Sequence, residues 1–256
     1  MKAAPEFTRS RGEKAMQVMK FSTFSISVAG KKSPTRRPEN QDRVLCRTLD
    51  VVGDQGMLLV VADGMSSSPY GGSLAKWVVE THLAKDAIAF VEGHNPADDL
   101  QSYLKQLHAQ FLKEFSGEGM EDFLASGASL SVALLHHDAA DCLWAGDSPM
   151  YVSRRTAAGY DTEKVTLPDH DPFGCLTNCF GAGTAFDIRH KRMDLSPGDI
   201  ITVASDGPRI DEQVLSSIYQ DYSFSKAALE HMVNISARGH FWDDLSIVSG
   251  QAVPRF

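Results

Sequence analysis

The sequence lacks a hydrophobic run long enough to cross a membrane, which needs roughly 18 consecutive apolar residues. Cysteine is scarce and unpaired by spacing: no C-x-x-C occurs among Cys46, Cys142, Cys175 and Cys179, and no signal peptide precedes them. This pattern favours free thiols in a reducing cytoplasm. Positive charge is also limited, because 25 Lys and Arg stand against 33 Asp and Glu, for a formal net charge of −8. We therefore expect a cytoplasmic protein that binds neither membranes nor nucleic acid.

What is abundant is apolar residues, which make up 43% of the 256 positions and suffice for a sizeable core. Residues 1–20 are polar and basic, and they lack the apolar centre of a signal sequence. We interpret them as a flexible leader or an artificial tail. The remainder shows no internal repeat and no linker, so residues 21–253 are expected to form one domain.

Strands and paired helices alternate along the chain. Apolar runs, period-two alternation and turn residues predict strands at 21–29, 44–49, 57–62, 128–135, 141–145, 150–154, 160–167, 185–193, 200–204 and 245–253. Helical periodicity predicts helices at 73–91, 97–115, 212–219 and 225–237. Ser73 is the expected cap of the first helix, with Leu74, Val78 and Thr81 among the residues on its apolar side. Because helices come in pairs, we predict an α+β fold of antiparallel sheets with helices outside.

Acidic residues stand at the ends of several of these strands. The apolar run 57–61 is closed by Ala62, Asp63 and Gly64, and a carboxylate at the tip of a buried strand is costly unless its charge is paired. The same pattern recurs further along the chain, and another acid precedes a strand; these residues are Asp42, Asp147, Asp206, Asp243 and Asp244. Hard cations prefer oxygen ligands, so we expect one carboxylate cluster around such ions.

Residues 168–183 differ from the rest, because they contain Pro and several Gly without a clean period. We expect an irregular loop or flap there. Ser66, Ser67 and Ser68 lie in another predicted loop, and no G-x-S-x-G pattern marks any of them as a nucleophile.

Six short motifs follow one another in order: Arg37-x-x-Asn40-Gln41-Asp42, Asp63-Gly64-Met65, Gly127-Ala128-Ser129-Leu130, Gly146-Asp147-Ser148-x-x-Tyr151, Ser205-Asp206-Gly207 and Asp243-Asp244-Leu245-Ser246. Each motif alone is weak. Their joint order, from about residue 21 to residue 253, resembles that of the metal-dependent serine/threonine protein phosphatases, the PPM or protein phosphatase 2C (PP2C) family, in its bacterial form. The resemblance implies an antiparallel β-sandwich flanked by pairs of helices. It also implies hydrolysis of phosphoserine and phosphothreonine by a hydroxide bound to two Mn²⁺ or Mg²⁺ ions.

The resemblance also assigns roles to the metal-binding acids. It implies that Asp63 bridges both ions and that the carbonyl of Gly64 binds one of them. Asp206 and Asp243 would complete the other ion, and Asp42 would act on the pair through water. From the residues alone, Asp244 could take the place of Asp243, but the family pattern puts the ligand first.

Two further residues have weaker assignments. Asp147, with Asp206, matches the position of a third, loosely bound ion, although an Asx-turn explains Asp147 equally well. Arg37 matches the arginine that binds the substrate phosphate, for which a guanidinium fork is suited. A solvated basic loop is the alternative for Arg37, since Lys31, Lys32 and Arg36 are its neighbours.

The sequence departs from the family at three places. Met65 stands where many eukaryotic members have His, Pro149 stands where Arg is usual, and the loop before Gly71 is longer than usual. These changes favour, as an alternative function, a catalytically weak or inactive regulatory module. A Ca²⁺-stabilised structural β-protein is a third hypothesis, against which the lack of a closely spaced Asp-x-Asp-x-Asp loop argues. The expected partners are a phosphorylated protein substrate and a cognate Ser/Thr kinase.

Overall fold

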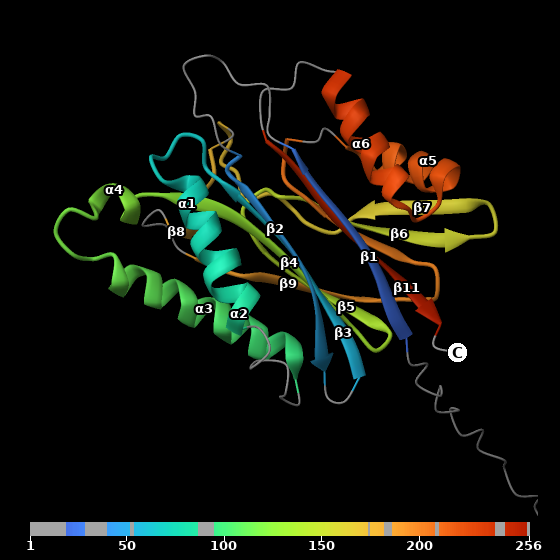
Figure 1. Ribbon diagram of the computed structural model, residues 1–256, viewed down its shortest axis with the longest axis horizontal. Coiled ribbons are helices and arrows are strands. Elements are labelled where there is room, and N and C mark those ends of the chain that lie inside the picture. Colours follow the sequence, from blue (N-terminus) through green and yellow to red (C-terminus); the bar gives the residue numbers. More distant parts are fainter. Residues whose placement is uncertain are drawn as a thin grey trace, which may run out of the picture.

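The computed structural model describes residues 19–28, 40–51, 54–86, 95–173, 175–181, 186–207, 210–238 and 244–254. Their strands form two antiparallel sheets (Figure 1). The first sheet contains, in spatial order, β1 (Met19–Val28), β11 (Leu245–Pro254), β10 (Ile200–Ala204), β6 (Met150–Thr156) and β7 (Gly159–Lys164). The second contains β2 (Asp42–Val51), β3 (Asp54–Gly64), β4 (Gly127–His136), β5 (Ala139–Ala145) and β9 (Arg189–Asp194), while the short β8 (Phe180–Gly181) pairs with β4.

Helices cover the outer side of each sheet (Figure 1). The helices that pack with the second sheet are α1 (Gly71–Lys76), the π-helix η1 (Trp77–Leu83), α2 (Ala84–Asp86), α3 (Pro96–Glu114) and α4 (Glu121–Leu124). Helices α5 (Glu212–Tyr222) and α6 (Lys226–Arg238) pack with the first sheet. The predicted α+β fold, an antiparallel β-sandwich flanked by helices, is therefore confirmed.

Strand β3 lies at the centre of the core and is buried on both faces. Leu58 and Val60 pack in the cluster that includes the helices α1 and α3, whereas Leu59 and Val61 pack in the sandwich interior with residues of the opposite sheet such as Val152. A strand with two buried faces needs an unbroken apolar run rather than alternation. The run at 57–61 is thus explained by the position of β3 between two layers.

The beginning of the first helix differs from the prediction. Helix α1 begins at Gly71, and Tyr70 occupies the N-cap position without a side-chain hydrogen bond. Ser73 therefore lies inside the helix and is not its cap. Gly71 and Gly72 start this helix where a cap such as Ser was expected.

The apolar side of this helix also differs from the prediction. From Trp77 to Leu83 the chain forms a π-helix, in which each hydrogen-bonded turn includes one extra residue. The extra residue rotates the buried side, so that Val79 and Leu83 are buried whereas Thr81 is exposed. Residues 87–91 of the predicted helix lie outside the described residues.

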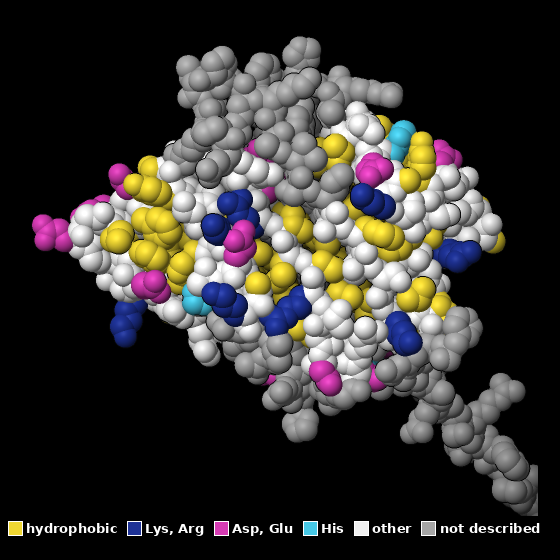
Figure 2. All heavy atoms as spheres, viewed as in Figure 1, with side chains coloured by type: hydrophobic (Ala, Val, Ile, Leu, Met, Phe, Trp, Pro, Cys, Tyr) yellow, Lys and Arg dark blue, Asp and Glu magenta, His cyan; other side chains and the backbone are white. Residues whose placement is uncertain are grey.

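The other predicted strands and helices lie within a few residues of their expected ends, and α4 and β8 were not predicted. None of the described helices is both long and apolar enough to span a membrane. The outer strands β1 and β2 lie side by side on the face shown in Figures 1 and 2. On the described part of this face, basic and acidic side chains are interspersed, so it carries no broad patch of one charge (Figure 2).

Candidate metal centre

The sheet brings the predicted acids together at one end of the sandwich. In the ladder of β2 and β3, Asp42 lies opposite Asp63, and Asp63 lies opposite Ser129 of β4 on its other side. Asp147 follows the end of β5 by two residues, and Asp206 follows β10 in the same way. One pocket collects these strand ends; it is lined by Asp63, Met65, Ser66, Ser67, Ser129, Asp147, Cys175, Leu176 and Asp206.

Asp42 is a buried acid behind this pocket. It is 3% exposed, and neither of its carboxylate oxygens has a hydrogen-bond partner within the described part of the chain. Burial raises the pKa of Asp42 from 3.8 to about 6, although the nearby hydroxyls of Ser205 and Ser246 act in the opposite direction. Such a carboxylate costs free energy unless a proton or a cation compensates its charge.

Asp206 and Asp147 are close enough to repel each other. Burial and then the charge of Asp147 raise the pKa of Asp206, while Asp63 and His170 act to lower it. Asp147 itself is bonded to the loop above the pocket, since Nε2 of His170 lies 2.9 Å from its Oδ2. Clustered carboxylates of this kind are stable at neutral pH only when a positive charge is near them.

Glycines allow three segments to meet behind the acids. A Cβ on Gly64 would lie 2.3 Å from the carbonyl carbon of Gly71, and a Cβ on Gly72 would lie 3.0 Å from Cα of Gln41. The end of β3, the start of α1 and the turn before β2 therefore approach more closely than side chains would permit. This packing explains why α1 begins with two glycines.

The turn that carries Asp147 is fixed by buried serines. Ser131 donates a hydrogen bond to the carbonyl of Ser148 at 2.7 Å, and the hydroxyls of Ser129 and Ser148 are bonded to each other. The preceding residue, Gly146, has a φ of +112°, and a Cβ there would lie 2.5 Å from that of Ser129. Residue 149, two positions after Asp147, is a proline without an N–H, so the Asx-turn alternative loses its donor.

The described part of the loop at 168–183 is irregular, as expected, apart from β8, but it has an internal anchor that the sequence did not reveal. The buried Asp169 accepts hydrogen bonds from the backbone N–H of Gly146 at 3.1 Å and from Nδ2 of Asn178 at 2.9 Å. It also forms an ion pair with Arg189 at the start of β9. These contacts tie the loop to the turn that carries Asp147.

The tip of this loop is organised by a second acid. Oδ1 of Asp171 accepts hydrogen bonds from the backbone N–H groups of Phe173 and Cys175, both at 2.9 Å. A bridge between His170 and Leu176 closes the turn. The tip therefore presents Cys175 and Leu176 to the pocket on a defined backbone.

Asp244 has a structural role beside the site. It is 4% exposed, and its Oδ2 accepts a hydrogen bond from the backbone N–H of Gln41 at 2.6 Å. This bond ties the turn before β2 to the start of β11. Asp244 is thus occupied in positioning this turn, which favours Asp243 as the ligand. Asp243 and Arg37 both lie outside the described residues, so their assignments stay predictions.

The described donors fit a hard divalent cation in kind, because the acids of the pocket offer only oxygen. No three His, Cys, Asp or Glu side chains within the described ranges stand in an arrangement that would hold an ion by themselves. Mg²⁺ retains several waters, so few protein ligands are needed, and the predicted ligand Asp243 is not among the described residues. The buried carboxylate of Asp42, which has no hydrogen-bond partner among the described residues, is the observation that favours a cation here.

Comparison with known families agrees with this geometry. A family model described as "Protein phosphatase 2C" matches residues 29–245, which is well over half of the chain. The chain therefore belongs to the protein phosphatase 2C family. None of the curated proteins matches it.

Solved structures show the same fold at low sequence identity. PppA, described as a key regulatory component of T6SS in Pseudomonas aeruginosa, is 22% identical; the match covers 92% of this chain and 99% of PppA, with a TM-score of 0.70. The serine/threonine phosphatase PstP/Ppp of Mycobacterium tuberculosis is 16% identical over 93% of this chain and 100% of its own, with a TM-score of 0.73. The catalytic domain of PstP in complex with two manganese ions is 17% identical over 92% of this chain and 100% of its own, with a TM-score of 0.72.

Proposed function

We propose that this protein hydrolyses phosphoserine and phosphothreonine in proteins and that it requires two Mn²⁺ or Mg²⁺ ions. The observation that carries the proposal is the convergence of Asp42, Asp63, Asp147 and Asp206, one of them buried without a hydrogen-bond partner among the described residues. Membership of the protein phosphatase 2C family supports the reaction, and the manganese complex of the similar PstP domain supports the choice of ion.

In this proposal different acids bind different ions. Asp63 would serve both ions, the carbonyl of Gly64 would bind one, and Asp206 and Asp243 would hold the other. Asp42 acts on the pair through water. When bound, such ions lower the pKa of a water molecule and neutralise phosphoryl oxygens during in-line attack.

Arg37 and Asp147 have supporting roles in this proposal. Arg37 binds the phosphate of the substrate through its planar guanidinium, which matches two phosphate oxygens. Replacing it by Ala is therefore expected to raise KM for phosphorylated substrates more than it changes metal affinity. Asp147, together with Asp206, offers a place for a third, weakly held ion.

A second candidate is a catalytically weak or inactive regulatory module. It is favoured by Met65, which lines the pocket in the position where many relatives carry a proton-donating His. Its sulfur lies 3.9 Å from Sγ of Cys179, so an apolar sulfur contact occupies this position. A Ca²⁺-stabilised structural role has no comparable support, because the family match concerns phosphatases.

The proposed reaction implies two kinds of partner. One is a phosphorylated protein substrate, and the other is a Ser/Thr kinase that adds the phosphate. The role of PppA as a regulatory component of T6SS applies to PppA, and it supports only the general idea of a regulatory phosphatase here.

The experiment is hydrolysis of p-nitrophenyl phosphate and of a phosphothreonine peptide with added Mn²⁺, with Mg²⁺, and after treatment with EDTA. We expect turnover with Mn²⁺ that EDTA abolishes and renewed Mn²⁺ restores. Asp63→Asn, purified in the same way, is the control for a contaminating phosphatase. Turnover that survives EDTA, or a folded protein that binds Mn²⁺ without hydrolysing either substrate, would contradict the proposal, and the second result would favour the regulatory module.

A further inference from the structure

Arg43 follows Asp42 in β2, and its side chain folds back onto the backbone of the turn that carries this acid. Its Nη1 donates hydrogen bonds to the carbonyls of Asn40 and Asp42, both at 2.7 Å. Its Nε lies 3.0 Å from Oε1 of Glu80 in the π-helix. One guanidinium therefore joins the two carbonyls on either side of Gln41 to the helix layer.

Two backbone N–H groups of this turn are also bonded. The backbone N–H of Asp42 donates to Oδ1 of Asn40 at 2.7 Å, and that of Gln41 donates to Asp244. Gln41 also packs closely against Gly72, as described above. The N–H groups of Gln41 and Asp42 are thus held by side-chain oxygens, and the carbonyls of Asn40 and Asp42 are held by Arg43. In contrast, the carboxylate of Asp42 makes no hydrogen bond to a described residue.

A surface ion pair alone would not deserve a functional role, since exposed pairs contribute about 0–1 kcal/mol to stability. Two features separate Arg43 from that case. Its side chain is only 22% exposed, whereas that of Glu80 is 51% exposed, so the guanidinium is the buried partner. Its two other bonds also go to backbone carbonyls that flank the acid, where a shift of the backbone would move the carboxylate directly.

The π-helix supplies a reason for the position of Glu80. In η1 the extra residue per turn rotates the side chains, with Val79 buried and Glu80 directed at β2. Such π-helical turns are found often at functional sites. The deviation from α-helical geometry here coincides with the contact that orients Arg43.

We propose that Arg43 is a positioning residue for Asp42, and that Glu80 of the π-helix holds Arg43 in place. The inference rests on the proposed function, in which Asp42 acts on the metal pair. Residues that orient metal ligands typically affect metal affinity or activity by about 10- to 100-fold when they are removed. Loss of Arg43 is therefore expected to weaken Mn²⁺ binding and to leave substrate recognition unchanged.

The test compares Arg43→Ala with Arg47→Ala, a matched control. Arg47 lies four residues further along β2 and donates to the carbonyl of Ala84 in α2, so it also joins β2 to this helix layer. Its hydrogen bond goes to α2 and not to the turn at 40–42. Two conservative variants, Arg43→Lys and Glu80→Gln, keep part of the hydrogen bonding, whereas Glu80→Ala removes it.

Three quantities are measured for each variant: Mn²⁺ affinity by calorimetry, amide hydrogen exchange of a peptide that spans residues 40–42, and kcat and KM with p-nitrophenyl phosphate across a Mn²⁺ titration. For Arg43→Ala we expect about tenfold weaker Mn²⁺ binding, faster exchange at the turn, unchanged KM, and recovery of kcat at high Mn²⁺. Glu80→Ala should show the same changes to a smaller extent. Arg43→Lys and Glu80→Gln should lie between their alanine variants and the unmodified protein.

The result that would overturn the inference is equal behaviour of Arg43→Ala and Arg47→Ala, with lower thermal stability but unchanged Mn²⁺ affinity and turn exchange. This outcome is distinguishable from failure of the proposed function, in which the unmodified protein itself lacks hydrolysis. In that case hydrogen exchange still tests the positioning role of Arg43. Faster exchange in Arg43→Ala but not in Arg47→Ala supports this role, and equal exchange in the two variants refutes it.

Discussion

Nε2 of His170 lies 2.9 Å from Oδ2 of Asp147, so the loop above the pocket is bonded to an acid that we propose as a metal ligand. The same loop presents Cys175 and Leu176 to the pocket. If Asp147 binds an ion as proposed, the imidazole and that ion would compete for one carboxylate. Binding of the ion and attachment of the loop at His170 would then oppose each other.

The first prediction follows from this competition. His170→Ala removes a hydrogen bond worth about 1 kcal/mol, so the Mn²⁺ concentration that gives half-maximal activation at the weaker site should fall by about fivefold. A Mn²⁺ titration of activity and of melting temperature measures the change. His231→Ala, on the outer helix α6, serves as the control. Weaker Mn²⁺ binding in His170→Ala would show instead that the imidazole is itself a ligand.

The second prediction concerns Asp42 in the absence of metal. Its pKa is raised from 3.8 to about 6, so the folded chain holds this proton more tightly than the unfolded chain does. The ionised carboxylate therefore destabilises the fold above about pH 6, and the cost fades as the pH falls from there toward 4. In EDTA at pH 7.5, Asp42→Asn should be more stable than the unmodified protein by about 1–3 kcal/mol.

Urea unfolding in EDTA at pH 7.5 and at pH 5 measures this difference. The gain should shrink at pH 5, and it should be absent in Asp161→Asn, whose carboxyl is exposed on β7. Added Mn²⁺ should reverse the order, because the ion stabilises the unmodified protein more than the variant. An Asp42→Asn protein that is less stable than its parent at pH 7.5 in EDTA would refute the idea that this acid is strained without an ion.

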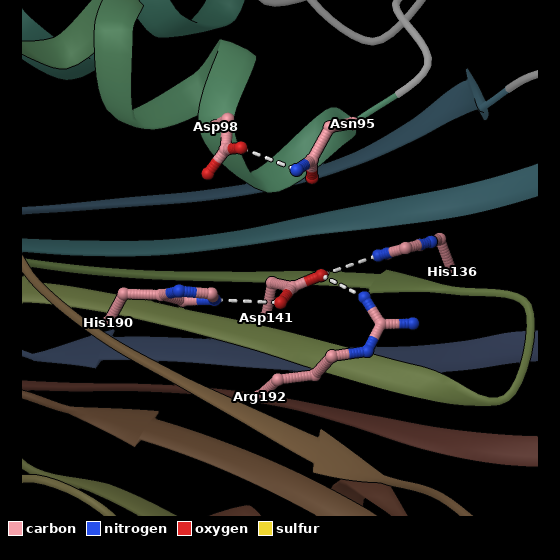
Figure 3. Close-up of polar contacts among 6 residues, drawn as sticks. All are labelled: Asn95, Asp98, His136, Asp141, His190 and Arg192. Atoms are coloured by element: carbon pink, nitrogen blue, oxygen red, sulfur yellow. Dashed lines mark hydrogen bonds and ion pairs between the residues drawn. The ribbon is translucent and has the colours of Figure 1, made fainter.

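The third prediction concerns a buried acid at the other end of the second sheet. Asp141 of β5 accepts contacts from Nε2 of His136 at 2.7 Å, Nε2 of His190 at 2.7 Å and Nη1 of Arg192 at 2.9 Å (Figure 3). Burial by itself would raise the pKa of Asp141, but the bonds from the two histidines and the charge of Arg192 outweigh it and lower the pKa. The ionised form is therefore the one that stabilises the fold.

For a lowered pKa, the stabilisation is present above the ordinary carboxyl pKa near 4 and is lost as the pH falls through the folded value. At pH 7, Asp141→Asn removes the charge that pairs with Arg192 and one of the two accepting oxygens, and it should cost about 1–3 kcal/mol. Below pH 4 the difference between the two proteins should narrow. Chemical unfolding between pH 7 and pH 3 measures it, and a pH-independent difference would contradict the assignment.

The sequence predicts the two-sheet core well, because β3 is buried on both faces and shows this as an apolar run that ends at Asp63. It also places Asp147 and Asp206 correctly after strand ends, since strand ends are visible as changes in hydropathy. The pairing of Asp42 with Asp63 is set by the register of β2 and β3, which changes in hydropathy do not reveal.

Other features leave no periodic trace. Asp169 and Asn178 anchor the loop at 168–183 through single hydrogen bonds in a segment without regular structure. No sequence pattern therefore predicts these two anchors. The π-helix is invisible for a different reason. Its extra residue shifts the buried side from Thr81 to Leu83, and a helical pattern read at 3.6 residues per turn assigns the wrong residue. The Arg43–Glu80 contact depends on that shift.

The last prediction compares the acid at the centre of the proposed site with the acid at its rim. Asp63 lies between Asp42 and Ser129 in the sheet, whereas Asp147 stands on a turn and is bonded to His170. In Asp63→Asn the shared anionic ligand is lost, and the amide offers one oxygen and directs its NH₂ at a cation. The pKa of the attacking water would rise, so turnover at neutral pH should fall by at least about 100-fold.

Asp147→Asn should behave differently, because its ion is held weakly and excess Mn²⁺ can compensate by mass action. Its kcat should return to within about threefold of the unmodified value at saturating Mn²⁺, while that of Asp63→Asn should not. The measurement is kcat for both variants across a Mn²⁺ titration, with circular dichroism to establish that each is folded. If Asp147→Asn were the more impaired at saturating Mn²⁺, the assignment of Asp63 as the bridging carboxylate would be wrong. Asp147, at the rim of the pocket, would then be the candidate for that role, and Asp63 would have only a structural role in the sheet.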